Sequence, residues 1–313
     1  MRILITGASG FVGTFLCREM IARGHAVRAA VRRLIPPAAV PPGLQQILVP
    51  DIAAEFDRRV LVEDVDTVVH LAAIAHRSGS IEGELRRVNC DASVRLVEAC
   101  AGLVRRFIFL SSVKVHGEDS RGGTYSEEDA LDPEDPYGRS KLEAERILTE
   151  TAARSGMELV TIRPPLVYGP GVKANFLRLL GWIYSGLPLP FSSVRNRRSL
   201  IYVGNLVDAI ARCADHPAAR GPFLVSDEET VSTPELVTRI AGALGRPARL
   251  FPAAPALLRF AGIVADRRDE IRRLTGNLVI NHAKARRLLD WLPPYTLDAG
   301  LAETARWFRA TRG

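Results

Sequence analysis

The sequence predicts an α/β fold in which a doubly wound parallel sheet carries a smaller C-terminal lobe. Three observations predict this fold. Short apolar strands alternate with helical patterns through the first half, a glycine-rich turn joins the first strand to the first helix, and Pro and Gly cluster at residues 163–171, where the alternation ends. Strands that alternate with helices form a parallel sheet that is covered on both faces.

The individual elements follow from apolar patterns and from residues that stop helices. The expected strands span residues 3–6, 26–31, 46–49, 67–71, 107–110 and 158–162. The expected helices span residues 11–23, 92–100 and 137–154, and Gly24 ends the first of them. Residues 200–215 predict a strand and a helix, and residues 222–225 predict another strand.

Composition restricts the class of protein. The chain has 313 residues, of which 47% are hydrophobic, as in ordinary globular domains. Its most apolar late stretch, residues 253–265, is interrupted by Arg259 and is too short to span a bilayer. Residues 1–7 run directly into a strand with no signal-peptide cleavage region, and the four cysteines show no paired spacing. We therefore expect a cytoplasmic protein with reduced thiols and no membrane partner.

The chain is basic, with a formal net charge of +7, and only four of its 42 basic residues are lysine. The arginines are scattered, without a long basic run or interleaved aromatic residues, so we expect no nucleic-acid partner. An anionic small ligand explains the charge as well. The six histidines form no HExxH-type cluster, and we expect no metal.

A glycine loop spans Gly7–Gly13, with glycines at positions 7, 10 and 13, between the first strand and the first helix. Glycine permits positive φ and close backbone approach, and a helix N-terminus presents free N–H groups to a pyrophosphate. A turn needed only for tight packing would also use glycines, but this position favours dinucleotide binding. We therefore expect a Rossmann-type NAD(P)-binding domain over residues 1–167 and a mainly substrate-binding domain over residues 168–313. About residues 200–226 can return to the Rossmann sheet.

The end of the second strand indicates the type of cofactor. A carboxylate there would bind the ribose 2′-hydroxyl of NAD, but residues 28–33 contain none. Arg32 and Arg33 can instead meet a 2′-phosphate, although both can also be solvated surface residues. Of NADP and NAD, the sequence therefore favours NADP.

A candidate catalytic group combines Tyr137 and Lys141 with a serine that follows the fifth strand, Ser112. The i, i+4 spacing puts Tyr137 and Lys141 on one helix face. A phenol has a pKa near ~10, and we expect the Lys141 ammonium to lower that of Tyr137. In a parallel sheet, a serine after a strand lies at the edge where ligands bind.

These motifs resemble a family, the extended short-chain dehydrogenase/reductases of the NAD-dependent epimerase/dehydratase group, which act on nucleotide sugars. The resemblance covers nearly the whole chain. It depends on the segments at residues 6–13, 70–73, 111–117, 137–141, 163–170 and 198–203, in matching order and approximate spacing. Residues 163–171 look most like bacterial surface-polysaccharide enzymes that reduce or epimerise C4 of UDP-N-acetylhexosamines.

The resemblance implies a role for each matching residue. Ser112 would orient the sugar oxygen, Tyr137 would be the acid–base, and Lys141 would also hold the nicotinamide ribose. Asp51 would contact adenine, and Asn175 and Arg198 would reach the substrate diphosphate. The cofactor-binding residues would be Gly7, Gly10, Phe11, Val12, Gly13, Arg32, Asp51, Ile52, Leu71, Ala72, Ala73, Tyr137, Lys141 and Pro164, and the substrate-binding residues Lys114, Asn175 and Arg198.

The sequence departs from the family pattern at two places that bear on the reaction and the substrate contacts. Dehydratases carry an Asp-Glu pair directly after the serine, where this chain has Val113 and Lys114, so a 4,6-dehydratase is not expected. An asparagine that usually contacts substrate is Leu166 here. The acidic stretch Glu118–Asp135 is either a substrate-side loop or a solvated one.

The favoured function is NADPH-dependent reduction of a UDP-4-keto-6-deoxy-N-acetylhexosamine, because no ribose-binding acid is present. The alternative is a UDP-hexose or UDP-N-acetylhexosamine 4-epimerase that retains NAD. A non-catalytic regulator that senses NADP is a third alternative, because fold alone does not determine function, but the intact Tyr137 and Lys141 argue against it. The expected partner is a UDP-sugar, and a homodimer is the assembly that we consider.

Overall fold

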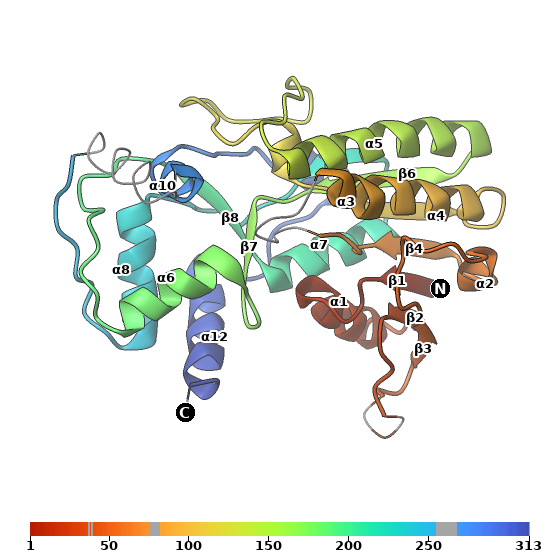
Figure 1. Cartoon of the computed structure of the whole chain (residues 1–313), viewed down its shortest axis with the longest axis horizontal. Helices are drawn as coiled ribbons and strands as arrows, with labels where there is room; N and C mark the ends of the chain where they lie inside the picture. Colours follow the sequence, from red (N-terminus) through yellow and green to blue (C-terminus); the bar gives the residue numbers. More distant parts are fainter. Residues whose placement is uncertain (37, 39, 75–81, 255–267, 313) are drawn as a thin grey trace.

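The computed structural model describes residues 1–36, 38, 40–74, 82–254 and 268–312 (Figure 1). A seven-stranded parallel sheet, in the order β3-β2-β1-β4-β5-β6-β9, forms its centre. Its strands are β1 (Arg2–Thr6), β2 (Ala26–Val31), β3 (Leu44–Leu48), β4 (Thr67–His70), β5 (Arg106–Leu110), β6 (Glu158–Arg163) and β9 (Gly221–Leu224). The predicted doubly wound α/β fold is confirmed.

Helices cover both faces of this sheet because its strands alternate apolar side chains between two cores. Ile3 and Ile5 of β1 face one core with helices α1 (Phe11–Ala22) and α7 (Val203–Asp215). Leu4 faces the other core, with α2 (Arg59–Val62), α4 (Ala92–Cys100) and α5 (Pro136–Ser155). A short helix α3 (Glu82–Arg86) and one π-helical turn (Arg87–Asp91) lead into α4.

The smaller lobe is formed mainly by the C-terminal part of the chain, to the left of the sheet in Figure 1. Its helices are α6 (Ala174–Tyr184), α8 (Thr233–Leu244), α10 (Arg268–Thr275) and α12 (Leu297–Ala310), whereas the short helix α11 (Ala283–Leu289) packs against β9 of the large sheet. A three-stranded sheet, β10-β8-β7, joins β7 (Leu166–Tyr168), β8 (Arg198–Tyr202) and β10 (Thr230–Val231). Between residues 200 and 226, the chain therefore returns to the large sheet through β9, and α7 packs on its face, whereas β8 belongs to the small sheet. The division into two functional domains stays a prediction.

The order of strands fixes where a ligand site can form. β1 lies between β2 and β4, so successive strands diverge from the β1–β4 boundary in opposite directions. Ligands of doubly wound folds bind beyond the carboxyl ends of the strands at such a switch point. The glycine loop follows β1 and the segment Leu71–Ile74 follows β4, so both flank that point.

The described residues contain no helix that is long and apolar enough to cross a membrane, and most of the apolar stretch 253–265 lies outside them. Nor do the described residues contain a group of three or more His, Cys, Asp or Glu side chains that could hold a metal.

Candidate active site

The glycine loop packs so closely that two of its glycines are required by shape alone. A Cβ on Gly7, which has φ +68°, would lie 2.8 Å from the backbone N of Ala72. A Cβ on Gly13 would lie 2.2 Å from the carbonyl oxygen of Gly7. Gly10 is the N-cap of α1 and offers no side-chain cap. The first amides of α1 are therefore left for a ligand such as a pyrophosphate.

The start of α5 carries the two predicted catalytic residues. Asp135 is its N-cap, with a carboxylate oxygen that accepts from the Gly138 N–H at 2.6 Å. Lys141 is buried, donates from Nζ to the carbonyl oxygen of Leu110 at 2.8 Å, and lies 4.5 Å from the centroid of the Phe109 ring. The Tyr137 ring centroid is 6.0 Å from Lys141 Nζ. Tyr137 and Lys141 thus face the carboxyl end of β5.

The electrostatics of this pair differ from the sequence prediction. Burial raises the pKa of Tyr137, and the negative charge of Asp135 raises it further. Burial also lowers the pKa of Lys141 to about 7, against a smaller opposing effect of Glu145. The prediction that Lys141 lowers the pKa of Tyr137 is therefore wrong for the cofactor-free chain, because desolvation outweighs an ammonium whose hydrogen bond goes to Leu110.

Ser112 lies on the loop that follows β5 and packs against the start of α5. It caps the 3₁₀ turn Val113–Val115, and its Oγ accepts from the Lys114 N–H at 3.3 Å. A Cβ on Gly138 would lie 2.8 Å from the carbonyl oxygen of Lys114, so this loop directly touches the turn that bears Tyr137. The Val113 N–H donates to the carbonyl oxygen of the buried Pro164 at 3.0 Å, which ties the loops after β5 and β6 together.

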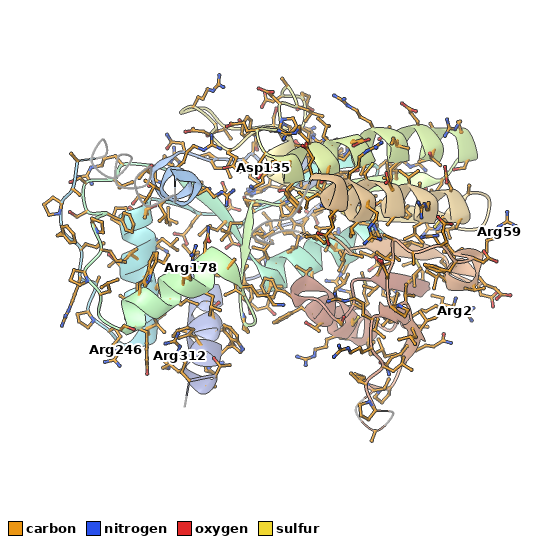
Figure 2. All side chains as sticks on the ribbon, viewed as in Figure 1. Arg2, Arg59, Asp135, Arg178, Arg246 and Arg312 are labelled. Carbon is orange, nitrogen blue, oxygen red and sulfur yellow. The ribbon has the colours of Figure 1, made fainter. Side chains whose placement is uncertain are left out.

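A cluster of charges lies on the far side of Ser112, towards the smaller lobe. Lys114 forms ion pairs with Glu118, at 2.6 Å, and with Asp135. The Glu118 carboxylate, whose side chain is 3% exposed, also pairs with Arg272 at 2.9 Å and with Arg273 at 3.1 Å, both from α10. Figure 2 shows Asp135 where the start of α5 approaches this lobe. The cluster links the two parts of the molecule next to the predicted catalytic residues.

Arg198 belongs to the same side as this cluster. Its guanidinium donates to the carbonyl oxygen of Gly276 at 3.1 Å. Burial lowers the pKa of Arg198 to about 10, with an opposing effect of Glu118 and a reinforcing one of Arg273. The neighbouring Arg197 precedes β8 and does not share these contacts, because it lines a different pocket.

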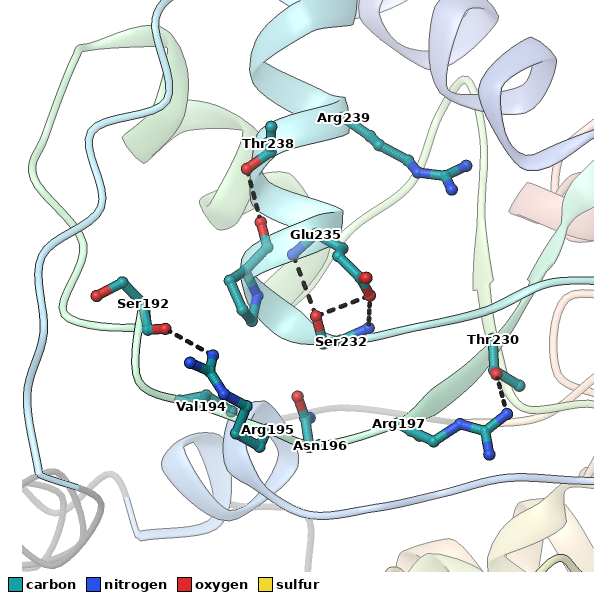
Figure 3. A pocket seen from close by; sticks show the side chains of 11 residues that line it. Ser192, Val194, Arg195, Asn196, Arg197, Thr230, Ser232, Glu235, Thr238 and Arg239 are labelled. Atoms are coloured by element: carbon teal, nitrogen blue, oxygen red, sulfur yellow. Dashed lines mark hydrogen bonds between the residues drawn. The ribbon is translucent and has the colours of Figure 1, made fainter.

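Arg195 and Arg197 line a separate pocket of about 730 Å³ between the 192–197 loop and the start of α8 (Figure 3). There Arg195 donates to the carbonyl oxygen of Ser192 at 3.0 Å, and Arg197 donates to Thr230 Oγ1 at 2.9 Å. Arg198 therefore lies near the charge cluster around Glu118, whereas Arg195 and Arg197 lie in the separate pocket.

Comparison with known proteins identifies the family. Residues 3–225 match the model of the "NAD dependent epimerase/dehydratase family". This chain belongs to that family. It is an extended short-chain dehydrogenase/reductase, the enzyme group that acts on nucleotide sugars.

Three similar proteins are informative. A UDP-glucose 4-epimerase of Vibrio cholerae is 42% identical over 98% of this chain and 95% of its own. The structure of MoeE5 with UDP-glucuronic acid and NAD has a TM-score of 0.81 and 27% identity, over 99% of this chain and all of its own. The UDP-glucuronic acid 4-epimerase of Bacillus cereus, solved with NAD, has a TM-score of 0.83 at 22% identity over both whole chains, and supports the fold.

The remaining residues expected from the family pattern lie in three places. Phe11 and Val12 are half-buried in the first turn of α1, and Leu71, Ala72 and Ala73 follow β4. Asn175 is in the first turn of α6, where its Oδ1 accepts from Arg178 at 2.6 Å. Their roles stay predictions.

Asp51 and Arg32, which are predicted to bind the adenosine part of the cofactor, differ in their contacts. Asp51 accepts from the Ala53 N–H and from Arg87, both at 2.9 Å, and these contacts lower the pKa of Asp51. Ile52 beside it is half-buried. Arg32 is exposed and forms no hydrogen bond or ion pair with any described residue.

Sequence reasoning missed several polar residues that the fold brings to this site. Arg272 and Arg273 come from α10, a helix that is not among the predicted elements, and Glu118 is one of many carboxylates in the acidic stretch Glu118–Asp135. Asn89 reaches the site from the π-helical turn before α4, and Ser93 from the first turn of α4. A π-helical turn is a local irregularity that is often found at functional sites but has no sequence signal.

Proposed function

We propose that this chain is a UDP-sugar 4-epimerase that retains NAD. One observation carries the proposal: the loop that contains Ser112 contacts the turn of α5 that bears Tyr137 and Lys141. This contact lies at the carboxyl edge of the large sheet, the same edge at which the glycine loop follows β1. The 42% identity to a UDP-glucose 4-epimerase over 98% of the chain favours this reaction over reduction. The Gly7–Gly13 loop, with its uncapped helix start, fits a dinucleotide.

The reaction needs both a proton and a hydride to leave the sugar and return. NAD, which the Gly7–Gly13 loop and Lys141 would hold, would supply the hydride acceptor for sugar C4 and the hydride donor for the opposite face of the ring. The Tyr137 phenolate would take the O4 proton and give it back, while the Ser112 hydroxyl holds the same oxygen. Lys141 would hold the nicotinamide ribose beside Tyr137.

The raised pKa of Tyr137 adds a condition to this mechanism. The phenol is protonated at neutral pH, so it can donate a proton to a ketone oxygen. Oxidation of the sugar alcohol needs the phenolate, which the raised pKa disfavours.

A second candidate, the NADPH-dependent 4-ketoreductase, is favoured by one observation. Arg32 and Arg33 are both exposed after β2, beside no carboxylate in residues 28–33, and can take a 2′-phosphate. The neighbours MoeE5 and the Bacillus cereus epimerase were solved with NAD, however, and the NADP preference expected from Arg32 gains no support from them. We therefore propose NAD. The regulator that we considered gains no support from these enzyme relatives either.

The test separates the two reactions. The purified protein is incubated with UDP-glucose, UDP-N-acetylglucosamine or UDP-glucuronic acid without added cofactor, and products are followed by NMR. The proposal predicts C4 inversion of at least one of them. Reduction of UDP-4-keto-6-deoxy-N-acetylglucosamine by added NADPH, without any inversion, would contradict it and support the ketoreductase.

A further inference from the structure

His70 is a residue of the 70–73 motif that the proposed reaction does not use. It ends β4, is 1% exposed, and stacks on the Phe109 ring with centroids 6.0 Å apart and planes 15° apart. Both ring nitrogens are hydrogen-bonded. Thr6 Oγ1 lies 2.7 Å from Nδ1, and Ser93 Oγ lies 2.8 Å from Nε2.

The neighbours of His70 determine which nitrogen carries the proton. Ser93 Oγ donates its only hydrogen to the carbonyl oxygen of Asn89 at 2.8 Å, so it has to accept from His70 Nε2–H. Nδ1 is then an acceptor for the Thr6 hydroxyl. Burial, reinforced by the charge of Lys141, lowers the pKa of His70 to about 3, so the ring stays neutral at neutral pH.

This chain of hydrogen bonds reaches the predicted cofactor segment from both ends. The Ala72 N–H donates to Thr6 Oγ1 at 3.3 Å. At the other end, the Asn89 side chain brackets the Ile74 backbone, accepting from its N–H at 2.8 Å and donating to its carbonyl oxygen at 3.0 Å. The backbone of the Leu71–Ile74 segment is thus held at two points.

The same series of hydrogen bonds also reaches α5, the helix that carries Tyr137 and Lys141. Asn89 Nδ2 also donates to Ser140 Oγ at 3.1 Å, and Ser140 Oγ donates to the carbonyl oxygen of Tyr137 at 2.8 Å. Thr6, His70, Ser93 and Asn89 are all fully buried, so none of these bonds competes with water. The end of β1, the segment after β4 and the first turn of α5 are therefore parts of one hydrogen-bonded network.

We propose that His70 is a positioning residue that sets cofactor affinity: its neutral ring, protonated on Nε2, holds the Leu71–Ile74 segment in register with the Tyr137 turn. His70 itself touches no reacting atom. The proposal rests on the proposed use of this segment as the cofactor's path, and it adds a buried residue, with a defined tautomer, to that site.

The test compares the cofactor affinity of four variants, measured by titration with NAD and with NADP. The cofactor that the wild type binds more tightly is the one used for the comparison. His70→Phe keeps a ring on Phe109 and removes both hydrogen bonds of His70. Ser93→Ala removes the acceptor of Nε2–H, together with the Ser93 hydrogen bond to the carbonyl oxygen of Asn89, and keeps the contact between Nδ1 and Thr6. His70→Gln restores one donor and one acceptor. Thr67→Val is the matched control, because Thr67 is buried at the other end of β4 and its Oγ1 has no partner among the described residues.

We expect cofactor affinity to fall about tenfold in His70→Phe and at least threefold in Ser93→Ala, as for the loss of one or two buried hydrogen bonds. His70→Gln recovers to within threefold of wild type, and Thr67→Val keeps wild-type affinity even if its thermal unfolding midpoint changes. With excess cofactor, Ser93→Ala keeps at least half of the wild-type kcat, because the loss lies in binding.

Cofactor affinity within twofold of wild type in Ser93→Ala, or an equal loss in Thr67→Val, overturns the proposal. Ser93→Ala decides alone if His70→Phe does not fold. The titration requires no sugar, so a wild type that binds cofactor but inverts no UDP-sugar contradicts the proposed function and leaves this inference standing.

Discussion

Lys141 shows how burial tunes a single residue for this chemistry. Its ammonium is surrounded by the sheet end and the Phe109 ring, and burial lowers its pKa to about 7. The lysine is therefore charged below neutral pH and neutral above it in the cofactor-free chain. Since the chain has only four lysines, this titration can be observed directly.

We predict that, in protein labelled with carbon-13 at the lysine side chains, one ε-carbon resonance titrates near pH 7. The same resonance should be missing from the Lys141→Met variant. A Lys141 resonance that changes only above about pH 9 would show that the residue is solvated rather than desolvated.

Arg198 and Arg197 provide a matched pair at the residue scale, since they are adjacent in the chain but have different surroundings. Arg198 lies with Glu118 and Arg273, whereas Arg197 lines the separate pocket. We expect Arg198→Ala to weaken UDP binding by roughly 10- to 100-fold, the effect of losing one charge-assisted contact. Arg197→Ala should change it less than twofold. Calorimetry with UDP measures both, and the reverse order would assign the diphosphate to the pocket of Figure 3.

At the element scale, α5 is held in place by a buried ion pair one turn beyond Lys141. Glu145 accepts from Arg163 of β6 through both carboxylate oxygens, at 3.1 and 2.5 Å, and both side chains are about as buried as the core. Removing one partner of such a pair strands the other charge in a low-dielectric interior.

Glu145→Gln should therefore lower the free energy of unfolding by about 3 kcal/mol, measured by urea denaturation. The control is Arg139→Ala on the same helix, whose ion pair with Glu82 is largely exposed and should contribute less than about 1 kcal/mol. Equal effects of the two substitutions would contradict this account of how α5 is anchored.

The elements that were predictable from sequence are those whose pattern is local. The predicted strand at residues 26–31 and the helices at 92–100 and 137–154 match β2, α4 and α5 within one residue at each end, because apolar spacing and end residues fix them. The three-stranded sheet β10-β8-β7 was not predicted, since it joins residues 166–231 across long separations. The π-helical turn that presents Asn89 was not predictable either.

The same distinction applies to the site. Ser112, Tyr137 and Lys141 are predictable as candidates because their spacing suggests the chemistry. The pKa shifts depend on burial, which no spacing reveals, so the pKa of Tyr137 is raised where a lowered one was predicted. His70 was part of a motif, but its bonds to Thr6 and Ser93 bring together three separate elements.

At the scale of the whole molecule, Glu118 links the Rossmann sheet to the smaller lobe. Its ordinary pKa is near ~4.3, and the contacts with Arg273 and Lys114 hold it well below that range despite the opposing effect of burial. A lowered folded-state pKa contributes stability above the unfolded-state pKa and loses it as the pH falls towards the folded value.

We predict that Glu118→Gln lowers the free energy of unfolding by about 3 kcal/mol at pH 7. The difference from wild type should stay constant down to about pH 5 and shrink by roughly 1.4 kcal/mol per pH unit below about 4.3. Urea denaturation at pH 7, 5 and 3 tests this. A difference that does not depend on pH would show that Glu118 is not ionised against these cations.

The central claim, hydride transfer at sugar C4 through a retained cofactor with Tyr137 as acid–base, is tested most directly with UDP-glucose deuterated at C4. The wild-type protein is incubated in ordinary water without added cofactor, and Tyr137→Phe, which keeps the fold but lacks the exchangeable proton, is run beside it. If UDP-glucose is the UDP-sugar that the protein inverts, we predict UDP-galactose that keeps its deuterium at C4, and almost no turnover by the variant; otherwise the C4-deuterated form of the sugar that is inverted takes its place. Inverted product that has exchanged its deuterium for solvent hydrogen, or a variant that keeps most of the wild-type kcat, would contradict the account.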